Sequence, residues 1–186
     1  MKLTLETLYR DHDGLRRILY LLEELLIAIY RGSSENYPLL RRILAYIQDH
    51  PERIHHPAED AVFSVIFRNG IRDRKFRDDV NTLMKDHSEI ECIIRDTIAT
   101  VDRVLVSNQP DVEGIGGKLS VLINRQREHL LFEEMNVYPY LAKHLDKKDW
   151  ESVAALIPDH EDPIFSGEVK KEYELIFKAI QAGKAG

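Results

Sequence analysis

The chain has 186 residues, of which 44% are hydrophobic and 31% are charged, the balance of a soluble globular domain long enough to bury a core. Its formal net charge of −6 argues against a nucleic-acid-binding surface and against an anionic membrane partner, because both attract clustered positive charge. The single cysteine, Cys92, excludes an intrachain disulfide and is expected to be a small buried residue on a helix.

The beginning of the chain lacks the pattern of a signal peptide. Acidic residues come early, at Glu6 and Asp11, and charged pairs at 16–17 and 23–24 break the apolar run that follows. No stretch approaches the roughly 20 consecutive apolar residues that span a bilayer. We therefore expect a cytoplasmic protein.

Apolar residues recur at helical spacing along most of the chain, and no stretch has a convincing strand-type alternation. Pro51 is expected to kink or restart the second helical region, because proline lacks an N–H donor and clashes with the preceding turn. The stretch 69–78 is expected to be a connection. In chain order, the expected helices cover residues 4–31, 37–69, 79–106, a fourth helix that ends near residue 143, 147–156 and 168–182.

Four long helices with short connections predict an all-α protein with an up-down-up-down four-helix bundle. We expect this bundle to cover residues 1–145. The remaining residues, 146–186, are expected to form a C-terminal helical extension packed on the outside of the bundle.

The two halves of the expected bundle carry the same polar residues. Asp11-His12 opens the first half and Asp86-His87 opens the second. A pair of the type His-x-x-x-Glu closes each half, with His55-x-x-x-Glu59 in the first and His129-x-x-x-Glu133 in the second. Chance placement of eight histidines would rarely give such a repeat, so we interpret the halves as two matched helical hairpins.

These polar residues lie on the apolar faces of their helices. His12 stands between Leu8 and Leu15, and His87 stands between Leu83 and Ile90 at the same spacing. Burying carboxylates and imidazoles without partners would be very costly. Metal ions remove this cost, because imidazole and carboxylate ligands suit iron, zinc, manganese or copper, and no thiolate cluster competes.

The spacing within each pair fits a site for two metals. Residues i and i+4 share one helix face, so the histidine can reach one metal while the glutamate bridges both. We expect His12 and His55 to bind one metal and His87 and His129 the other. The expected cofactor is two iron ions, Fe²⁺ or Fe³⁺, with an oxo or hydroxo bridge, and with zinc or manganese as substitutes. Each metal would keep an open position for oxygen, nitric oxide, peroxide or water.

These residues resemble the hemerythrin-like, HHE cation-binding family. The matching motifs cover roughly residues 4–144 and are Asp11-His12, His55-His56-Pro57-Ala58-Glu59-Asp60, Asp86-His87, and His129-Leu130-Leu131-Phe132-Glu133-Glu134 with Tyr138-Pro139. The resemblance implies a non-haem di-iron centre. Oxygen-carrying members place a second histidine one turn after the third-helix histidine, where this chain has Glu91. The set is therefore more similar to bacterial members linked to nitrosative stress and iron–sulfur repair.

Several neighbours of the ligand set have more than one interpretation. His56 and Asp60 form a rival i, i+4 pair, although their helix face carries polar residues and is expected to be solvated. Alternatively, His56 is an extra metal ligand or a residue that contacts the ligands from outside. Glu91 is expected first as an acceptor for a ligating imidazole, with a seventh ligand or an ordinary helix residue as alternatives. Asp11 and Asp86 are either such acceptors or plain surface charge.

Pro57 indicates either backbone strain at the site or the first turn of a restarted helix. Four tyrosines either tune an oxidising centre or, for the most part, belong to the core and rim: Tyr9, Tyr20, Tyr138 and Tyr140. The remaining histidines fall near helix ends or loops and are expected to be non-ligands: His50, His144 and His160.

Three functions are compatible with these features. The first is a di-iron protein that binds or reacts with O₂, NO or peroxide in sensing or stress defence. The second is a protein that stores or delivers iron, for instance for iron–sulfur cluster repair, without turnover. The third is a metal-free structural bundle. A small ligand is the expected partner at the metal site, without nucleic acid or membrane, in a monomer or homodimer.

Overall fold

The computed structural model describes residues 3–33, 36–70, 72–157, 161–165 and 167–183. Within these residues the regular structure is entirely helical, as predicted. The α-helices are α1 (Leu5–Tyr30), α2 (Tyr37–Asp49), α3 (His56–Arg68), α4 (Arg74–Ser107), α5 (Val112–Phe132), α6 (Tyr138–His144), α7 (Lys147–Leu156) and α8 (Glu174–Gly183). Two π-helical turns, Pro51–His55 and Glu133–Val137, join α2 to α3 and α5 to α6, and a short 3-10 turn, Lys171–Tyr173, precedes α8.

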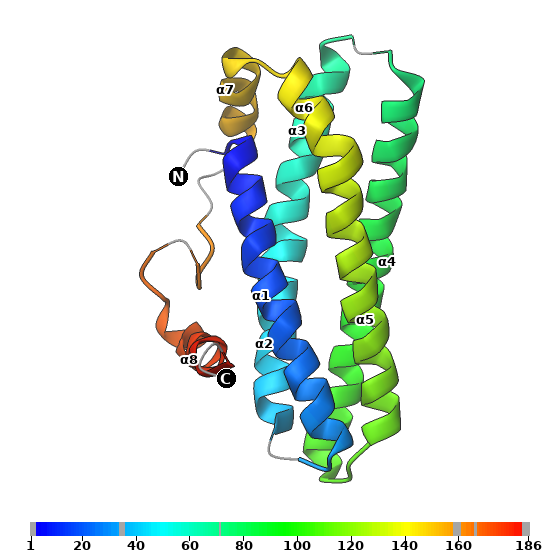
Figure 1. Cartoon of the computed structure of the whole chain (residues 1–186), viewed down its shortest axis with the longest axis vertical. Coiled ribbons are helices and arrows are strands. Elements are labelled where there is room, and N and C mark those ends of the chain that lie inside the picture. Colours follow the sequence, from blue (N-terminus) through cyan, green and yellow to red (C-terminus); the bar gives the residue numbers. More distant parts are fainter. Residues whose placement is uncertain (1–2, 34–35, 71, 158–160, 166, 184–186) are drawn as a thin grey trace.

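Four long helical columns run in alternating directions (Figure 1). The columns are α1, α2 with α3, α4, and α5 with α6. The α1 column packs against α5 and α2, and the α4 column packs against the same two neighbours. Each column therefore has two neighbours around a common interior, which confirms the predicted up-down-up-down bundle.

The connection after α3 is shorter than predicted, because α4 begins at Arg74 rather than near residue 79. Asp73 has an extended backbone, and its carboxylate accepts a hydrogen bond from the amide of Phe76 at 3.0 Å. This cap satisfies an amide of the first turn that has no partner within the helix. The ring of Phe76 is buried against the bundle, so the charged segment still gains from forming a helix.

Both π-helical turns directly precede a dipeptide that ends in proline, His56-Pro57 at the start of α3 and Tyr138-Pro139 at the start of α6. The amide of His56 donates to the carbonyl of Pro51, five residues back, and the amide of Tyr138 donates to Glu133 in the same way. A π-helical turn contains one residue more than an α-helical turn, which relieves the clash that proline causes. The predicted interruption at Pro51 is confirmed, and Pro57 lies in the first turn of a restarted helix.

Buried apolar residues form two separate clusters along the bundle. One cluster extends from Leu15 toward the α1–α2 and α4–α5 connections, and the other extends from Leu8 toward α7. His12 stands between Leu8 and Leu15 on α1, and His87 has the same place between the two clusters on α4. The polar residues singled out by the sequence therefore form a layer between two apolar layers.

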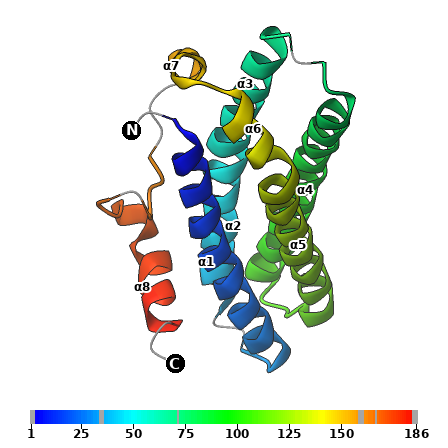
Figure 2. The same cartoon turned by 45° about the horizontal axis from the view of Figure 1, so that its top comes forward.

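The C-terminal residues lie along the outside of the bundle. In Figure 1 and Figure 2, α7 lies at one end of the bundle beside α3, and α8 lies beside α1 and α2. Asp162 joins this segment to the bundle, because one carboxylate oxygen accepts a 2.7 Å hydrogen bond from the hydroxyl of Tyr46. Its other oxygen accepts the amides of Ile164 and Phe165 at 2.7 and 2.9 Å.

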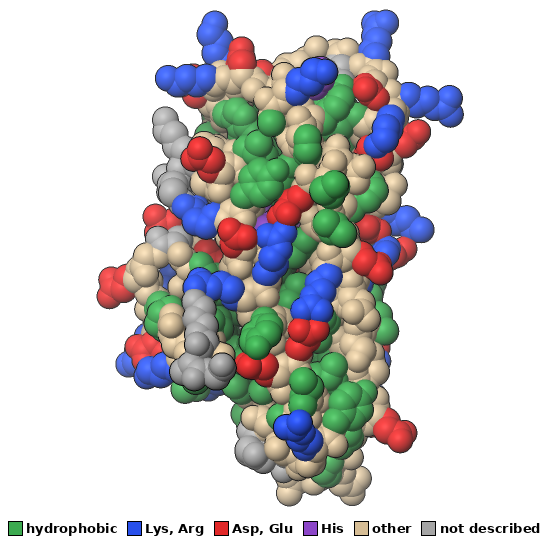
Figure 3. Space-filling model, viewed as in Figure 1, with side chains coloured by type: hydrophobic (Ala, Val, Ile, Leu, Met, Phe, Trp, Pro, Cys, Tyr) green, Lys and Arg blue, Asp and Glu red, His purple; other side chains and the backbone are tan. Residues whose placement is uncertain are grey.

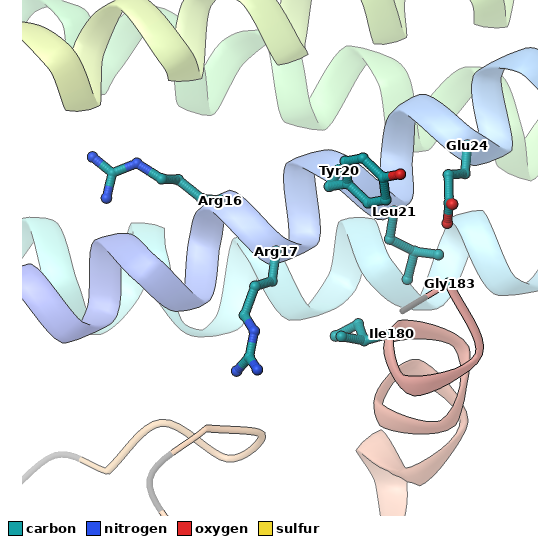
Figure 4. Close-up of a pocket in the computed structure, with 7 residues that line it drawn as sticks. All are labelled: Arg16, Arg17, Tyr20, Leu21, Glu24, Ile180 and Gly183. Carbon is teal, nitrogen blue, oxygen red and sulfur yellow. The ribbon is translucent and has the colours of Figure 1, made fainter. Parts of the chain in front are cut away.

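The face of the molecule drawn in Figure 3 carries charges of both signs and almost no visible histidine. A surface pocket of about 200 Å³ lies between α1 and α8 (Figure 4), and its wall includes Arg17, Tyr20 and Ile180 but none of the predicted ligands. Among the described helices, none is both long and apolar enough to cross a membrane. The prediction that Cys92 is buried is wrong, because it lies on the exposed side of α4 beside Arg95.

Candidate metal centre

The structure brings all six predicted ligands together in the interior of the bundle. Each side chain is between 0% and 10% exposed, and every column contributes at least one. They are His12 on α1, His55 in the first π-helical turn, Glu59 on α3, His87 on α4, His129 on α5 and Glu133 in the second π-helical turn.

The inward nitrogen of each histidine, Nε2, faces one of the two glutamates. For Glu133 the distances are 3.2 Å from His12 and 3.3 Å from His129. For Glu59 they are 3.7 Å from His55 and 3.6 Å from His87, and His87 also lies 3.7 Å from Glu133. The glutamates therefore lie between the histidines of the two hairpins.

The donor atoms of the predicted ligands other than Glu133 fall into two groups, each with all of its atoms within 4.8 Å of one another. The first group is His12, His55 and Glu59; the second is His56, Glu59, His87 and His129. The histidines are divided as the sequence predicts, and Glu59 belongs to both groups. The second group also contains His56, which the sequence left open as an extra ligand or an outer residue.

Many of these inward atoms have no hydrogen-bond partner. They include Nε2 of His55, His87 and His129, one oxygen of Glu59 and both oxygens of Glu133. Several lie within ion-pair distance of each other, but the contacts lack hydrogen-bond alignment. A buried polar atom left in this state costs about 1–3 kcal/mol. Imidazole nitrogens and carboxylate oxygens at such distances fit the donor set of one or two transition-metal ions.

The two glutamates have opposite pKa shifts. Burial and the neighbouring Glu59 raise the pKa of Glu133 well above its usual range. Burial acts in the same direction on Glu59, but His55, His87 and His12 outweigh it and lower the pKa of Glu59. Two carboxylates in contact favour sharing one proton. Metal ions between them would take the place of that proton.

The imidazoles are held mostly in the neutral form that binds metal. Burial lowers the pKa of His12 and His129, and it lowers the pKa of His87 to about 3. His55 differs, because Glu59 and Asp11 outweigh the effect of burial and raise its pKa. The site therefore offers mainly unprotonated nitrogens at neutral pH.

Carboxylates also form hydrogen bonds with the outer nitrogens of two predicted ligands. Asp11 lies 3.2 Å from Nδ1 of His55. It is therefore an acceptor for the imidazole, which is one of the two roles that the sequence left open for it. Glu134, which the sequence analysis missed as a functional residue, lies 2.9 Å from Nδ1 of His12. Hydrogen bonds from His12 and Arg16 lower the pKa of Glu134 to about 2, so it is a charged acceptor. The sequence signal that could have identified Glu134 was its position directly after the predicted ligand Glu133.

The corresponding residues of the second hairpin lie elsewhere. Asp86 accepts a 2.6 Å hydrogen bond from Arg125 rather than contacting an imidazole. Glu91, expected first as an outer acceptor, has a half-exposed side chain that lies 3.7 Å from Arg95. Glu91 therefore lies outside the donor groups, because its side chain, one turn after His87, points toward solvent.

The prediction that His56 faces solvent is wrong, since the residue is 4% exposed. Asp60, its predicted partner, has a side chain that is 45% exposed; its carboxylate lies 3.9 Å from Nδ1 of His87 and is not part of either donor group. Successive helical residues are about 100° apart, and the face that a helix buries in a bundle is at least that wide. His55 and His56 can therefore both reach the interior, although they are adjacent in sequence.

Tyr138 also belongs to the site. This agrees with one of the two interpretations that the sequence left open, in which a tyrosine tunes the metal centre. Its buried hydroxyl donates a 2.7 Å hydrogen bond to Glu59 and lies 2.8 Å from Nε2 of His12. In a regular α-helix a residue five positions after Glu133 would point about 140° away from it. The π-helical turn between them adds a residue and rotates Tyr138 back toward the interior.

The other residues considered as candidates lie outside the groups. His50 is buried 3.2 Å from Asp162, and His144 is exposed and stacks on Tyr140. His160 falls outside the described residues. Tyr9 packs edge-on against Tyr138, and Tyr20 lines the surface pocket of Figure 4.

Comparison with known proteins agrees with this geometry. A family model, described as the hemerythrin HHE cation binding domain, matches residues 3–141. The match includes every member of both donor groups and ends before α7. No curated protein and no solved structure matches the chain. Because the family model covers well over half of the sequence, this chain belongs to the hemerythrin HHE cation binding domain family.

Proposed function

We propose that this chain holds two iron ions through His12, His55, Glu59, His87, His129 and Glu133, and that the pair binds or reacts with O₂, NO or peroxide. The observation that supports this most strongly is the pair of buried donor groups that share Glu59. Several of their inward atoms lack hydrogen-bond partners, namely Nε2 of His55, His87 and His129 and one oxygen of Glu59. Iron bound there would supply redox chemistry and an electrophilic site for a small molecule.

The burial of the ligands favours a resident cofactor over an ion in transit. The six side chains are at most 10% exposed, and apolar clusters lie on both sides of the layer that they form. An ion held in this way would leave only when the surrounding helices open. Storage or delivery of iron, the second hypothesis, requires more accessible ligands.

The same burial limits what can react. A molecule with only a few atoms can reach a site enclosed by packed helices, and the apolar layers keep bulk water away from it. Tyr138 is the protein group best placed to act on such a molecule, because its hydroxyl lies at the first donor group and holds a proton toward Glu59. These properties support a role in sensing or stress defence.

The remaining residues would stabilise this centre from outside. We infer that residues 1–145 form the metal-binding unit and that residues 146–186 are an extension of it. The buried contacts of Asp162 with Tyr46 support this division, because they fasten the extension to α2 a few residues before the first π-helical turn.

Metal analysis of protein purified without added metal tests the proposal. We expect two irons per chain and visible absorption from an oxidised iron pair. Anomalous-scattering maps on both sides of the iron edge would identify the metal and its ligands together. Turnover of O₂, NO or peroxide should disappear in Glu59→Ala. A folded protein that contains no transition metal and cannot be loaded with any would overturn the proposal.

A further inference from the structure

His56 lies among the metal donors, although its sequence neighbours predicted a solvated face. Its ring is parallel to that of His87, with centroids 3.9 Å apart and planes 5° apart, and it meets His129 edge-on at 5.3 Å. One of its nitrogens lies within 4.8 Å of the donor atoms of Glu59, His87 and His129.

A buried carboxylate faces the outer nitrogen of this ring. Nδ1 of His56 lies 3.3 Å from Glu52, whose side chain is 5% exposed. At two predicted ligands a carboxylate forms a hydrogen bond with the outer nitrogen, Glu134 with Nδ1 of His12 and Asp11 with Nδ1 of His55. The contact of Nδ1 of His56 with Glu52 is of similar length but lacks hydrogen-bond alignment. A carboxylate on the outer nitrogen fixes the ring and directs the other nitrogen toward a metal. His56 is therefore placed like the ligands, and Glu52 has the position of its acceptor.

The second hairpin has no equivalent of this residue. His55 corresponds to His129 in the sequence repeat, so His56 corresponds to Leu130, which is buried in an apolar cluster. Without His56, each donor group has two imidazoles. With His56, the second group has three and the first has two.

We propose that His56 is a metal ligand, the third imidazole of the ion held by His87 and His129, and that Glu52 positions it. This inference rests on the proposed metal centre. It implies that the two ions have different numbers of imidazole ligands. The extra imidazole comes from α3, beside Glu59, rather than from the position one turn after His87, where Glu91 faces Arg95. The ion in the second group is then bound by one more nitrogen and is held more tightly than its neighbour.

His56→Leu tests this proposal, because it replaces the imidazole with the apolar side chain that the second hairpin has at Leu130. Fe²⁺ affinity would be measured by chelator competition, and the number of imidazoles per metal by X-ray absorption. We expect the ion of the second group to bind at least about tenfold more weakly and the imidazole signal per metal to fall. His144→Leu, a change at the exposed histidine, should alter neither measurement.

Glu52→Gln provides a second variant that retains the histidine. It should weaken the same ion by a smaller factor and leave the imidazole count unchanged. If His56→Leu folds, binds both ions with wild-type affinity and keeps the wild-type imidazole signal, His56 is not a ligand. If the wild-type protein itself binds no metal, the proposed metal centre fails instead, so the two failures are distinguishable.

Discussion

The two hairpins of the bundle start from the same sequence pattern and use it differently. Each has an Asp-His dipeptide on its first helix and a His-x-x-x-Glu pair on its second. In the first hairpin the residue after the paired histidine is His56, which enters the donor groups, while in the second it is Leu130, which enters an apolar cluster. The second hairpin contributes Tyr138 instead. A repeat in sequence therefore does not produce equal metal environments.

The position of the π-helical turn explains part of this difference. In the first hairpin the turn ends at His55, before the paired glutamate, and in the second it begins at Glu133 itself. Each turn shifts the register of the residues that follow it. As a result, Tyr138 reaches the first donor group, whereas Ser64, the residue at the same distance from Glu59, is exposed.

The largest effect is expected at the carboxylate that both donor groups share. Glu59→Ala removes the carboxylate that both groups share and leaves the first group with only two imidazoles, so we expect the variant to lose both metals. Elemental analysis would measure the metal content. In thermal unfolding, metal at about 100-fold above its dissociation constant stabilises the wild-type protein by roughly 2.7 kcal/mol.

The Glu59→Ala variant should show no such stabilisation by metal. Glu128→Ala, a change at an exposed glutamate on α5, is the matched control and should keep both ions. Retention of two ions by Glu59→Ala would contradict the idea that one carboxylate serves both hairpins.

The two Asp-His dipeptides offer a direct comparison of the second-largest effect. Asp11 contacts Nδ1 of His55, whereas Asp86 contacts Arg125. Asp11→Asn should reduce Fe²⁺ affinity about 10–100-fold, the usual loss when the acceptor behind a ligating histidine is changed. Asp86→Asn should leave the affinity nearly unchanged. Equal losses in chelator competition would show that the dipeptides act alike.

A smaller effect is expected at Tyr138. Tyr138→Phe removes a hydrogen bond to a buried carboxylate, which contributes about 1.5–3 kcal/mol when the acceptor is charged. Urea unfolding of the metal-free protein should show a loss of this order. Tyr140→Phe is the control, because that ring is only partly buried and stacks on Phe76. If both variants unfold at the same urea concentration, the Tyr138 hydroxyl does not stabilise the site.

The smallest effect is expected at the position where oxygen-carrying relatives place a further histidine. Glu91 is half-exposed beside Arg95, so a histidine there would point to solvent. Glu91→His should leave the metal content, the metal affinity and the number of imidazoles per metal unchanged. A rise in the imidazole signal would show that α4 can bring this position into the second group, and it would weaken the assignment of that place to His56.

Helical periodicity was enough to predict the bundle and the burial of the six polar residues in its interior. The i, i+4 spacing places His55 with Glu59 and His129 with Glu133 on one face, and apolar residues on both sides of His12 identify that face as the buried one. The burial of these residues follows from the sequence because each helix has only one apolar face.

Tertiary structure alone decided which neighbours of these residues belong to the site. Periodicity gives the direction of a side chain around its own helix, but not the width of the buried face, so His56 was placed in solvent. It does not reveal the π-helical turn that directs Tyr138 inward. It also gives no information on partners across helices, and that is why Asp11 and Asp86, with the same sequence neighbour, contact a histidine and an arginine respectively.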